Sequence, residues 1–276
     1  MLTAVRVGCG VLFGYHEHMT NRMVAISECV VVTPRIVSAL ADLNRLAEKL
    51  VPCKGELRVT VLDTVTDLDV AVDGADRKAS HEFPLLGRVA AEADFARLSV
   101  NGETVIEIRP PALDFGGAAT VPPPGSFVQA SANAEAAMAA AVLKAIGGAK
   151  RVADLFAGSG TFALRIAREA VVHAVESDKA AMAALDRSWR QTPGLKTITQ
   201  EVRDLFRSPL RPKETENFDA MVFDPPRAGA KEQAEQLAAS KMPDIVAVSC
   251  SPATLAHDPR TLVDGGYQVQ SVQPVD

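Results

Sequence analysis

The stretch that most constrains the fold of this chain runs from Arg151 to Glu176. An apolar run meets a turn that contains Gly158 and Gly160, a helical segment follows, and a second apolar run ends at Glu176. This order is typical of a β-α-β nucleotide-binding unit, in which the glycines let the backbone turn sharply and approach a ligand closely. Glu176, at the carboxyl end of the second strand, is placed to accept hydrogen bonds from a ribose. The sequence therefore predicts a ligand that contains a nucleoside.

The glycines alone do not identify this ligand. Residues 158–163 also satisfy the pattern Gly-x-Gly-x-x-Ala of dinucleotide-binding proteins, so an NAD-dependent oxidoreductase remains an alternative. Asp154, at the end of the first strand, favours another ligand. Its carboxylate would repel a pyrophosphate but would attract the ammonium and sulfonium groups of S-adenosylmethionine. We therefore favour S-adenosylmethionine, whose positive charge the Asp154 carboxylate would attract.

Composition indicates a globular chain. With 276 residues, of which 47% are hydrophobic and 23% charged, the chain can bury two cores. The net charge of −5 means that affinity for a nucleic acid would have to come from a local basic patch. The four scattered cysteines argue against a disulfide framework and against a metal site. Without a membrane-spanning apolar run or a secretion signal, we expect a cytoplasmic protein that is a monomer with no membrane partner.

Consecutive prolines, Pro122–Pro124, mark a stiff linker between two predicted domains. Residues 1–120 alternate in the manner of strands and include one amphipathic helix over 35–50, which predicts a small α+β domain that we interpret as a substrate platform. In residues 121–276 strands alternate with helices, and one more strand is expected over 267–272. The predicted fold class is α/β, a doubly wound parallel sheet preceded by the smaller domain.

The segment from Asp224 to Arg227 follows an apolar strand, at the place where open α/β sheets bind ligands. Its two prolines fix the loop and present a rigid wall to a flat group. A related loop of amino-methylating enzymes carries an aromatic residue in the last position, which Arg227 replaces here. Arginine favours a target with a developing negative oxygen or a phosphate. The alternative is a rigid turn whose arginine pairs with an acid.

Cys250 is the candidate nucleophile. It follows a strand and precedes a helix for which Ser251 is a natural N-cap and Pro252 occupies the first turn. A thiol beside the positive end of a helix has a lowered pKa, which favours the nucleophilic thiolate. The alternative is a small apolar core residue. Together with a methyl-donor site, the pattern favours the nucleophile.

Three segments resemble the motifs of the RNA uracil-C5 methyltransferases. They read DLFAGSGTF at 154–162, FDPPRAG at 223–229 and VSCSPATLAHD at 248–258, and the third is highly specific. The segment Phe127–Gln129 also resembles the family's Phe-x-Gln segment. The resemblance implies a Rossmann-like class I methyltransferase that carries a methyl group from S-adenosylmethionine to C5 of a uridine in RNA, with ribosomal RNA preferred and transfer RNA as the alternative.

The same resemblance implies roles for particular residues. Cys250 would be the nucleophile, with Asp224 and Arg227 beside it in the reaction. The residues that would contact S-adenosylmethionine are Gln129, Phe156, Thr161, Glu176, Asp204 and Asp224, in addition to Asp154, Gly158 and Gly160 identified from the nucleotide-binding unit.

The chain departs from the family pattern at both ends. It lacks the family's amino-terminal RNA-binding barrel, and only Cys29 matches a ligand of the iron–sulfur cluster that many members carry, so we expect no cluster. It also stops before the family's Phe-Pro-x-x-x-His-x-Glu segment, which supplies the proton-abstracting glutamate, and before the last strand. We therefore expect a fragment that turns over slowly and accumulates an RNA adduct. The alternative is a non-catalytic module that binds S-adenosylmethionine and RNA.

Overall fold

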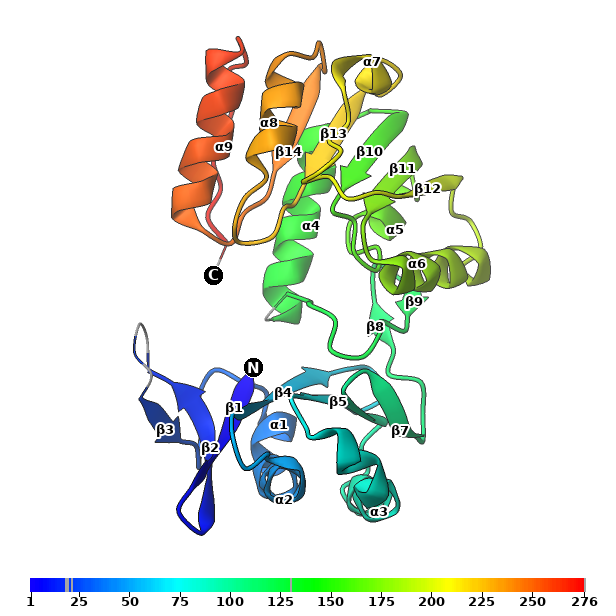
Figure 1. The fold of residues 1–276 in the computed structure, drawn as a ribbon. Helices are drawn as coiled ribbons and strands as arrows, with labels where there is room; N and C mark the ends of the chain where they lie inside the picture. Colours follow the sequence, from blue (N-terminus) through cyan, green and yellow to red (C-terminus); the bar gives the residue numbers. More distant parts are fainter. Residues whose placement is uncertain (18–19, 21, 130, 276) are drawn as a thin grey trace. The chain divides into compact units, whose positions relative to one another are not determined.

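The computed structural model describes residues 1–17, 20, 22–129 and 131–275. The chain divides into two compact units (Figure 1). The first comprises Met1–Leu113 and Val121–Ser126, and the second comprises Asp114–Thr120 and Phe127–Asp276. Residues 18, 19 and 21 fall in the predicted amino-terminal strands and lie outside the described residues, as do residues 130 and 276.

Side-chain contacts hold the chain on either side of the predicted boundary at residue 120 within its own unit. Thr120 donates a hydrogen bond to Ser188 with an Oγ1–Oγ distance of 2.8 Å, which ties the segment before the linker to the second unit. The carbonyl oxygen of Pro122 accepts from Arg97 Nη2 at 2.8 Å, which ties the prolines themselves to the first unit. The linker is therefore packed against the first unit.

The first unit contains a seven-stranded sheet with strand order β3-β2-β1-β4-β5-β6-β7. All neighbouring strands are antiparallel except β5 and β6, which are parallel. The β5–β6 connection carries a helix, α3, as a parallel pair requires a crossover. The strands are β1 (Leu2–Val7), β2 (Gly10–His16), β3 (Met23–Ala25), β4 (Glu56–Asp63), β5 (Leu68–Asp73), β6 (Arg97–Val100) and β7 (Glu103–Glu107).

Helices of the first unit pack on one face of this sheet and form its core. The predicted helix over 35–50 is divided into α1 (Pro34–Ser38) and α2 (Leu40–Leu50), because the chain bends at Ala39. The apolar stripe expected for α2 is confirmed, since Leu40, Leu43, Leu46 and Leu50 are buried. The remaining elements of this face are a 3₁₀ helix, η1 (Arg77–Glu82), and α3 (Phe83–Glu92).

The first unit also buries an ion pair, between Asp69 on β5 and Arg97 on β6. Arg97 donates from Nε to Asp69 Oδ1 at 2.9 Å and from Nη2 to Oδ2 at 2.7 Å. The two side chains are only 1% and 5% exposed. Because Arg97 Nη2 also donates to Pro122, this pair fixes the linker backbone.

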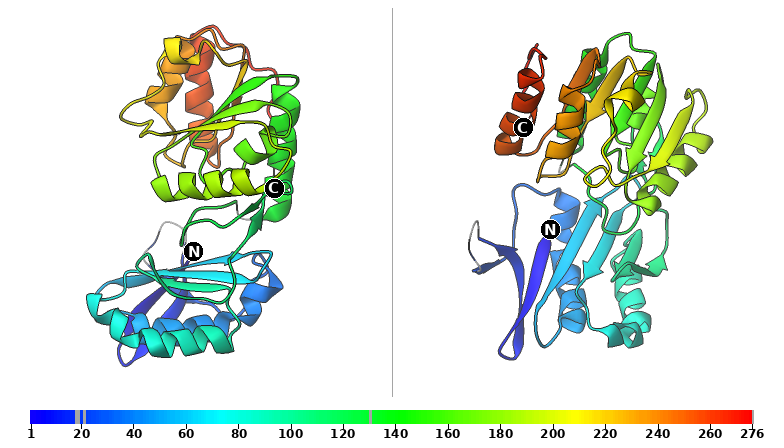
Figure 2. Two further views of the ribbon diagram at one scale, coloured as in Figure 1. Left: turned by 90° about the vertical axis from the view of Figure 1, so that its right-hand side faces the viewer. Right: turned by 45° about the horizontal axis from the view of Figure 1, so that its top comes forward.

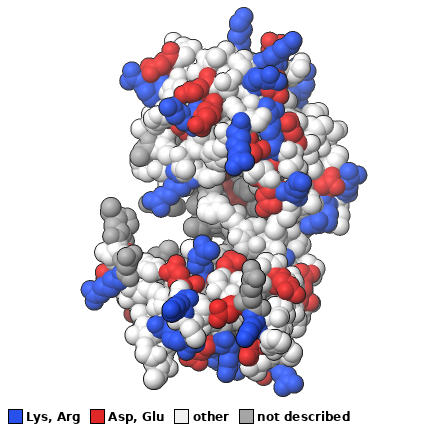
Figure 3. Space-filling view, in the orientation of Figure 1, with Lys and Arg blue, Asp and Glu red and all other residues white. Residues whose placement is uncertain are grey.

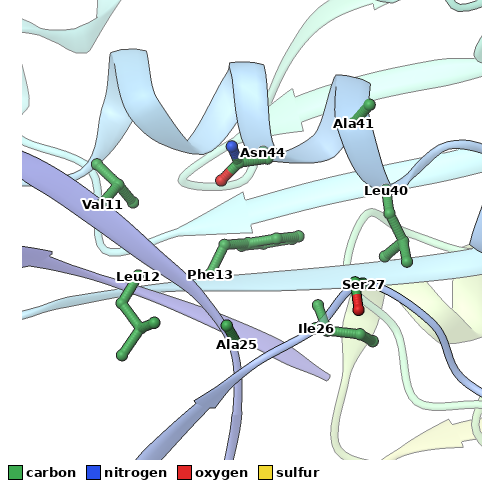
Figure 4. Close-up of a pocket in the computed structure, with 9 residues that line it drawn as sticks. All are labelled: Val11, Leu12, Phe13, Ala25, Ile26, Ser27, Leu40, Ala41 and Asn44. Atoms are coloured by element: carbon green, nitrogen blue, oxygen red, sulfur yellow. The ribbon is translucent and has the colours of Figure 1, made fainter.

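A hollow of about 400 Å³ lies between β2 and α2 in the first unit (Figure 4). Phe13, Ile26 and Leu40 are among the residues that line it, and Ser27 and Asn44 are its polar residues. No charged side chain lines this hollow among the described residues, so it does not suit an ionic ligand.

The second unit confirms the predicted α/β class. A parallel sheet with strand order β12-β11-β10-β13-β14 carries helices on both faces (Figure 2). A two-stranded ladder, β8 (Leu113–Asp114) with β9 (Ala119–Thr120), precedes it in the chain. The other elements are α4 (Ala132–Ile146), β10 (Arg151–Leu155), α5 (Ala163–Ile166), β11 (Val171–Glu176), α6 (Lys179–Gln191), β12 (Ile198–Val202), α7 (Pro212–Thr215), β13 (Ala220–Phe223), α8 (Lys231–Ala238), β14 (Asp244–Ala247) and α9 (Pro252–Asp264).

One predicted strand of this unit does not form. Residues 267–272 have no strand partner among the described residues, and Val269 and Val272 are 59% and 73% exposed. Tyr267, at the start of this segment, is anchored by a hydrogen bond, since its hydroxyl lies 3.0 Å from Ser240 Oγ. An alternating pattern needs a neighbouring strand to pair with, and the sequence alone does not reveal whether one is present.

None of the helices formed by the described residues is both long and apolar enough to cross a bilayer.

The hydrophobic core of the second unit lies against its parallel sheet. Ala153 and Leu155 of β10 and Met221 and Phe223 of β13 are buried there. Strands buried on both faces read as nearly continuous apolar runs, which is the pattern that the sequence shows.

Candidate cofactor and nucleophile site

The carboxyl edge of the parallel sheet gathers the predicted site residues. Parallel strands end at the same edge, so residues that follow different strands become neighbours. Asp154 ends β10, Glu176 ends β11 and Asp224 directly follows β13. Asp204 lies two residues beyond β12, and Cys250 lies three residues beyond β14.

The glycine-rich turn after β10 has an unusual backbone. Phe156 adopts φ of +63°, and Gly158 and Gly160 adopt φ of +53° and +103°. A side chain at Gly160 would come 2.5 Å from Leu185, so this glycine allows the turn to pack against α6. A side chain at Gly158 would meet nothing within 4 Å. Gly158 therefore keeps a stretch of backbone open to a ligand, whereas Gly160 serves internal packing.

Glu176 connects this turn to the end of β11. Its Oε2 accepts a hydrogen bond from the Gly158 N–H at 3.1 Å. Its Oε1 accepts from the N–H groups of Ser177 and Asp178, at 2.6 and 2.9 Å, and from Ser177 Oγ at 2.9 Å. Oε2 has one protein donor and therefore retains capacity for a ligand hydroxyl. The carboxylate is held in place before any ligand binds.

Asp154 is a buried carboxyl without a partner. It has no exposed surface, and neither of its oxygens makes a hydrogen bond within the described residues. Burial raises the pKa of Asp154 well above its usual value, and the negative charge of Asp224 raises it further. The nearby Ala163 N–H acts in the opposite direction and lowers this pKa in part. Because Asp154 is fully covered, we expect it to act on a cationic ligand through its charge.

Asp224 adds a second perturbed carboxyl on the neighbouring strand. Burial raises the pKa of Asp224 to about 6. A positive charge near Asp154 and Asp224 would favour the ionised form of both. The acids and the open glycine turn thus fit the sulfonium, ammonium and ribose of S-adenosylmethionine, which was expected from the sequence.

An aromatic cluster at the same edge includes a residue that sequence reasoning missed. The ring of Phe156 lies 5.5 Å from that of Phe206 and 6.0 Å from that of Phe223, measured between centroids. Phe206 is 42% exposed. Asp204 shapes the turn that presents it, since Asp204 Oδ1 accepts from the Phe206 N–H at 3.0 Å. The sequence signal that could have identified Phe206 is its position two residues after Asp204, an acid that follows a strand. Phe206 and Phe156 could flank a flat purine.

The start of α4 is tied to the glycine-rich turn by Arg165. Its Nη2 lies 2.7 Å from Glu135 Oε1 on α4, and its Nη1 donates to the Thr161 carbonyl oxygen at 2.7 Å. Gln129 is half-buried and precedes Ser131, whose hydroxyl caps α4. This bridge links the segments that carry two predicted cofactor residues, Gln129 and Thr161.

Cys250 lies exposed in the turn between β14 and α9, which excludes the alternative of a core cysteine. Ser251 occupies the N-cap position and Pro252 the first turn of α9, as predicted, but the Ser251 hydroxyl makes no cap hydrogen bond. Ser249 shapes the turn instead. Its Oγ accepts from the Ser251 N–H at 3.2 Å and lies 3.0 Å from Thr254 Oγ1. A cap bond would run from the N–H of a residue two or three positions further on to the Ser251 hydroxyl, and the N-cap pattern does not reveal whether that bond forms.

Arg227 is presented by a tight turn. The Gly229 N–H donates to the Pro226 carbonyl oxygen at 2.7 Å and closes the turn, with Arg227 exposed at its second position. Arg227 makes no ion pair with any acid that the structure describes, which argues against the alternative of a purely structural arginine. Its guanidinium is available to a substrate.

Ionisation of Asp224 should make stability depend on pH. The pKa is raised in the folded state, so folding is favoured by the neutral form, and this contribution is lost as pH rises from about 4 through about 6. We expect Asp224→Asn to have a free energy of unfolding higher than that of the wild type at pH 8, by on the order of 2 kcal/mol, and therefore to unfold at a higher temperature. At pH 4 the two should be equal. A temperature difference that stays constant between pH 4 and pH 8 in thermal unfolding would contradict this assignment.

Loss of the Glu176 carboxylate should weaken cofactor binding. We expect Glu176→Ala to reduce affinity for S-adenosylhomocysteine by about 1–3 kcal/mol, because a charged acceptor and the anchor of Gly158 are both removed. Isothermal titration calorimetry measures this directly. Glu169→Ala, an exposed acid of the same unit, is the control and should bind as the wild type does. Equal affinity in a folded Glu176→Ala variant would remove Glu176 from the site.

Comparisons with known proteins identify relatives of the whole chain. A family model described as "Conserved hypothetical protein 95" matches residues 136–249. An uncharacterized RNA methyltransferase of Mesorhizobium japonicum is 48% identical over 276 residues, which cover 100% of this chain and 67% of that protein. One of Zymomonas mobilis is 34% identical over 282 residues, with 99% of this chain and 70% of that protein covered. The chain spans about two thirds of the length of such relatives.

Two more distant proteins have specific names. The 23S rRNA (uracil(1939)-C(5))-methyltransferase RlmD of Chromohalobacter salexigens is 29% identical over 285 residues, which cover 95% of this chain and 58% of that protein. The tRNA (uracil-54, C5)-methyltransferase of Pyrococcus abyssi, solved with S-adenosyl-L-homocysteine, superimposes with a TM-score of 0.65 at 22% identity and covers 94% of this chain and 68% of its own. At that identity the likeness shows the fold. Together with the relatives of higher identity, these findings confirm the resemblance seen in the motifs, and the chain belongs to the family of S-adenosylmethionine-dependent RNA methyltransferases.

Proposed function

We propose that this protein transfers a methyl group from S-adenosylmethionine to C5 of a uridine in RNA through a covalent adduct with Cys250. The observation that carries the proposal is the exposed Cys250 thiol at the sheet edge that also holds Asp154, Glu176 and Asp224. An exposed thiol beside a methyl-donor site has no structural purpose of its own.

The chemistry explains why a nucleophile is required. Uracil C5 is too weak a nucleophile to take a methyl group directly. When the Cys250 thiolate adds to C6, the electron pair of the C5–C6 double bond moves toward O4 and forms an enolate. S-adenosylmethionine, when bound, supplies a methyl group on a positively charged sulfur. C5 of the enolate takes up this methyl group and leaves neutral S-adenosylhomocysteine. Release then requires a general base, a role that we do not assign to Cys250, Asp224 or Arg227, to take the C5 proton while the Cys250 sulfur leaves C6 as a thiolate.

Two residues of the loop after β13, the strand that pairs with β14, support this step. Arg227, free of ion pairs with the described acids, can donate hydrogen bonds to the enolate oxygen or to a phosphate. Asp224 begins the same loop and lies beside the buried Asp154, so it connects the cation site to the reaction site. Pro225 and Pro226 lie between Asp224 and Arg227, and their restricted backbone angles fix the conformation of the loop that carries both residues.

The RNA partner follows from the same chemistry. The target base has to be flipped out of its stack before a protein thiol can reach C6. Positive and negative side chains are interspersed on the face that Figure 3 shows, so we expect a local contact surface rather than a broad basic one. We propose ribosomal RNA as the substrate, with transfer RNA as the alternative. The first unit would be the platform that binds this RNA, and the reaction would take place in the cytoplasm.

The test is nucleoside mass spectrometry of RNA after incubation with the protein and S-adenosylmethionine. The expected product is a uridine methylated at C5, recovered as 5-methyluridine where C5 has lost its proton and as a nucleotide bonded to Cys250 where it has not. Methylation at another atom would overturn the proposal. Binding of NAD in preference to S-adenosylhomocysteine, measured by calorimetry, would favour the oxidoreductase alternative.

A further inference from the structure

Asp258 is a buried acid of α9 that the proposed reaction does not use. Its side chain is only 7% exposed. Oδ2 accepts a hydrogen bond from the Ala230 N–H at 3.1 Å, and Oδ1 lies 3.2 Å from Nδ1 of the largely exposed His257. Ala230 ends the loop that carries Arg227 and immediately precedes α8. A carboxylate on the helix that follows Cys250 is thus bonded to the backbone of the arginine loop.

Gly229 shows how closely α9 approaches this loop. It adopts φ of +76°, and a Cβ atom at this position would come 3.0 Å from Asp258 Oδ2 and 3.3 Å from Thr254 Cγ2. The N–H of Gly229 closes the turn that presents Arg227. Asp258 therefore lies against the end of that turn, where only glycine leaves room for it.

The same face of α9 also shapes the turn of Cys250. Thr254 Oγ1 lies 3.0 Å from Ser249 Oγ and donates to the Ser251 carbonyl oxygen at 3.1 Å. Ser249 and Ser251 flank Cys250 in the sequence. Thr254 and Asp258 are one helical turn apart, so a single helix face contacts the nucleophile turn with one residue and the arginine turn with the other.

We propose that Asp258 is a positioning residue that sets the Arg227 turn relative to Cys250. The inference rests on the proposed function, because it concerns the distance between the donor for the enolate oxygen and the sulfur that attacks C6. Both groups have to meet one uracil ring at the same time, and a displacement of about 1 Å costs up to about a hundredfold in rate. The Ala230–Asp258 hydrogen bond joins the arginine turn to α9, and Thr254 on the same face of α9 contacts the Cys250 turn.

A double-mutant cycle tests this role. Asp258→Ala should lower the single-turnover rate of Cys250-dependent RNA adduct formation about tenfold or more. In an Arg227→Ala background the same change should cost less than about threefold, because the group that Asp258 positions is already absent. Asp258→Asn keeps an oxygen that accepts from Ala230 and should restore most of the rate. Equal losses in both backgrounds would overturn the proposal.

The matched control is Asp264→Ala, on the same helix. Asp264 is exposed and pairs only with Arg260 at 2.9 Å among the described residues. It should leave the adduct rate unchanged. Affinity for S-adenosylhomocysteine should stay at the wild-type value in all single variants, which separates a positioning effect from general loss of folding.

Hydrogen exchange gives a readout that needs no substrate. Asp258→Ala should raise amide exchange in a peptide covering 224–232, and Asp258→Asn should do so much less. Unchanged exchange would overturn the anchoring role. If the wild-type chain forms no Cys250-dependent adduct but the exchange rises as expected, the proposed function is contradicted while the anchoring of the loop by Asp258 is supported.

Discussion

Replacing Cys250 with serine is expected to lower formation of methylated RNA by a factor on the order of 10⁶, the size of loss seen when an enzyme nucleophile is removed. Serine is nearly the same size, but its hydroxyl is far less nucleophilic than a thiolate, so C6 of uracil is not attacked. Because Cys250 is exposed, the substitution should change the free energy of unfolding by less than about 0.5 kcal/mol. The loss of activity would therefore be chemical.

The measurement is denaturing electrophoresis with substrate RNA and a labelled methyl donor, with product quantified in parallel. The wild type should show a band of protein linked to RNA, and Cys250→Ser should show none. Cys53→Ser is the matched control, because Cys53 is also an exposed thiol but belongs to the first unit. Methylation that survives in Cys250→Ser would contradict the covalent mechanism. Loss of the adduct in Cys53→Ser, with the adduct kept in Cys250→Ser, would assign the nucleophile to Cys53.

Replacing Arg97 with methionine is expected to destabilise the first unit by about 3–5 kcal/mol. The change leaves Asp69, whose side chain is 1% exposed, as a buried charge without its bidentate partner. It also frees the Pro122 carbonyl, so the linker loses its anchor. Removing one member of a buried pair costs far more than the pair itself contributes, since the remaining charge stays desolvated.

The control for this prediction is the double variant Asp69→Leu with Arg97→Met. With both charges replaced by apolar side chains of similar volume, the double variant should recover most of the stability lost in Arg97→Met. Urea unfolding of the full chain, followed by a probe in each unit, separates the two transitions. A single variant that loses less than about 1 kcal/mol would show that water reaches Asp69 and screens it.

Local pattern accounts for much of the second unit. The order of apolar runs, glycines and helical segments predicted the alternating strands and helices of a doubly wound sheet, and these are present as β10 to β14 with their helices. The same reasoning failed at residues 267–272, where no strand forms among the described residues, and it placed Ser251 at the N-cap of α9 without its side-chain hydrogen bond. A strand needs a partner, and a cap bond needs a particular side-chain orientation, and neither condition can be read from periodicity.

The candidate site divides in the same way. The sequence by itself determined which residues end at the binding edge, because in a parallel sheet every strand ends on the same side, and it determined the glycines that the turn needs. Only the tertiary structure decided that the Asp154 carboxyl is fully buried, that Phe206 lies against Phe156, and that Asp258 accepts a hydrogen bond from the end of the arginine loop. Each of these depends on contacts between residues 28 to 70 positions apart in the chain. Burial and packing of such distant segments are settled by how the whole core closes, so no local pattern of residue types encodes them.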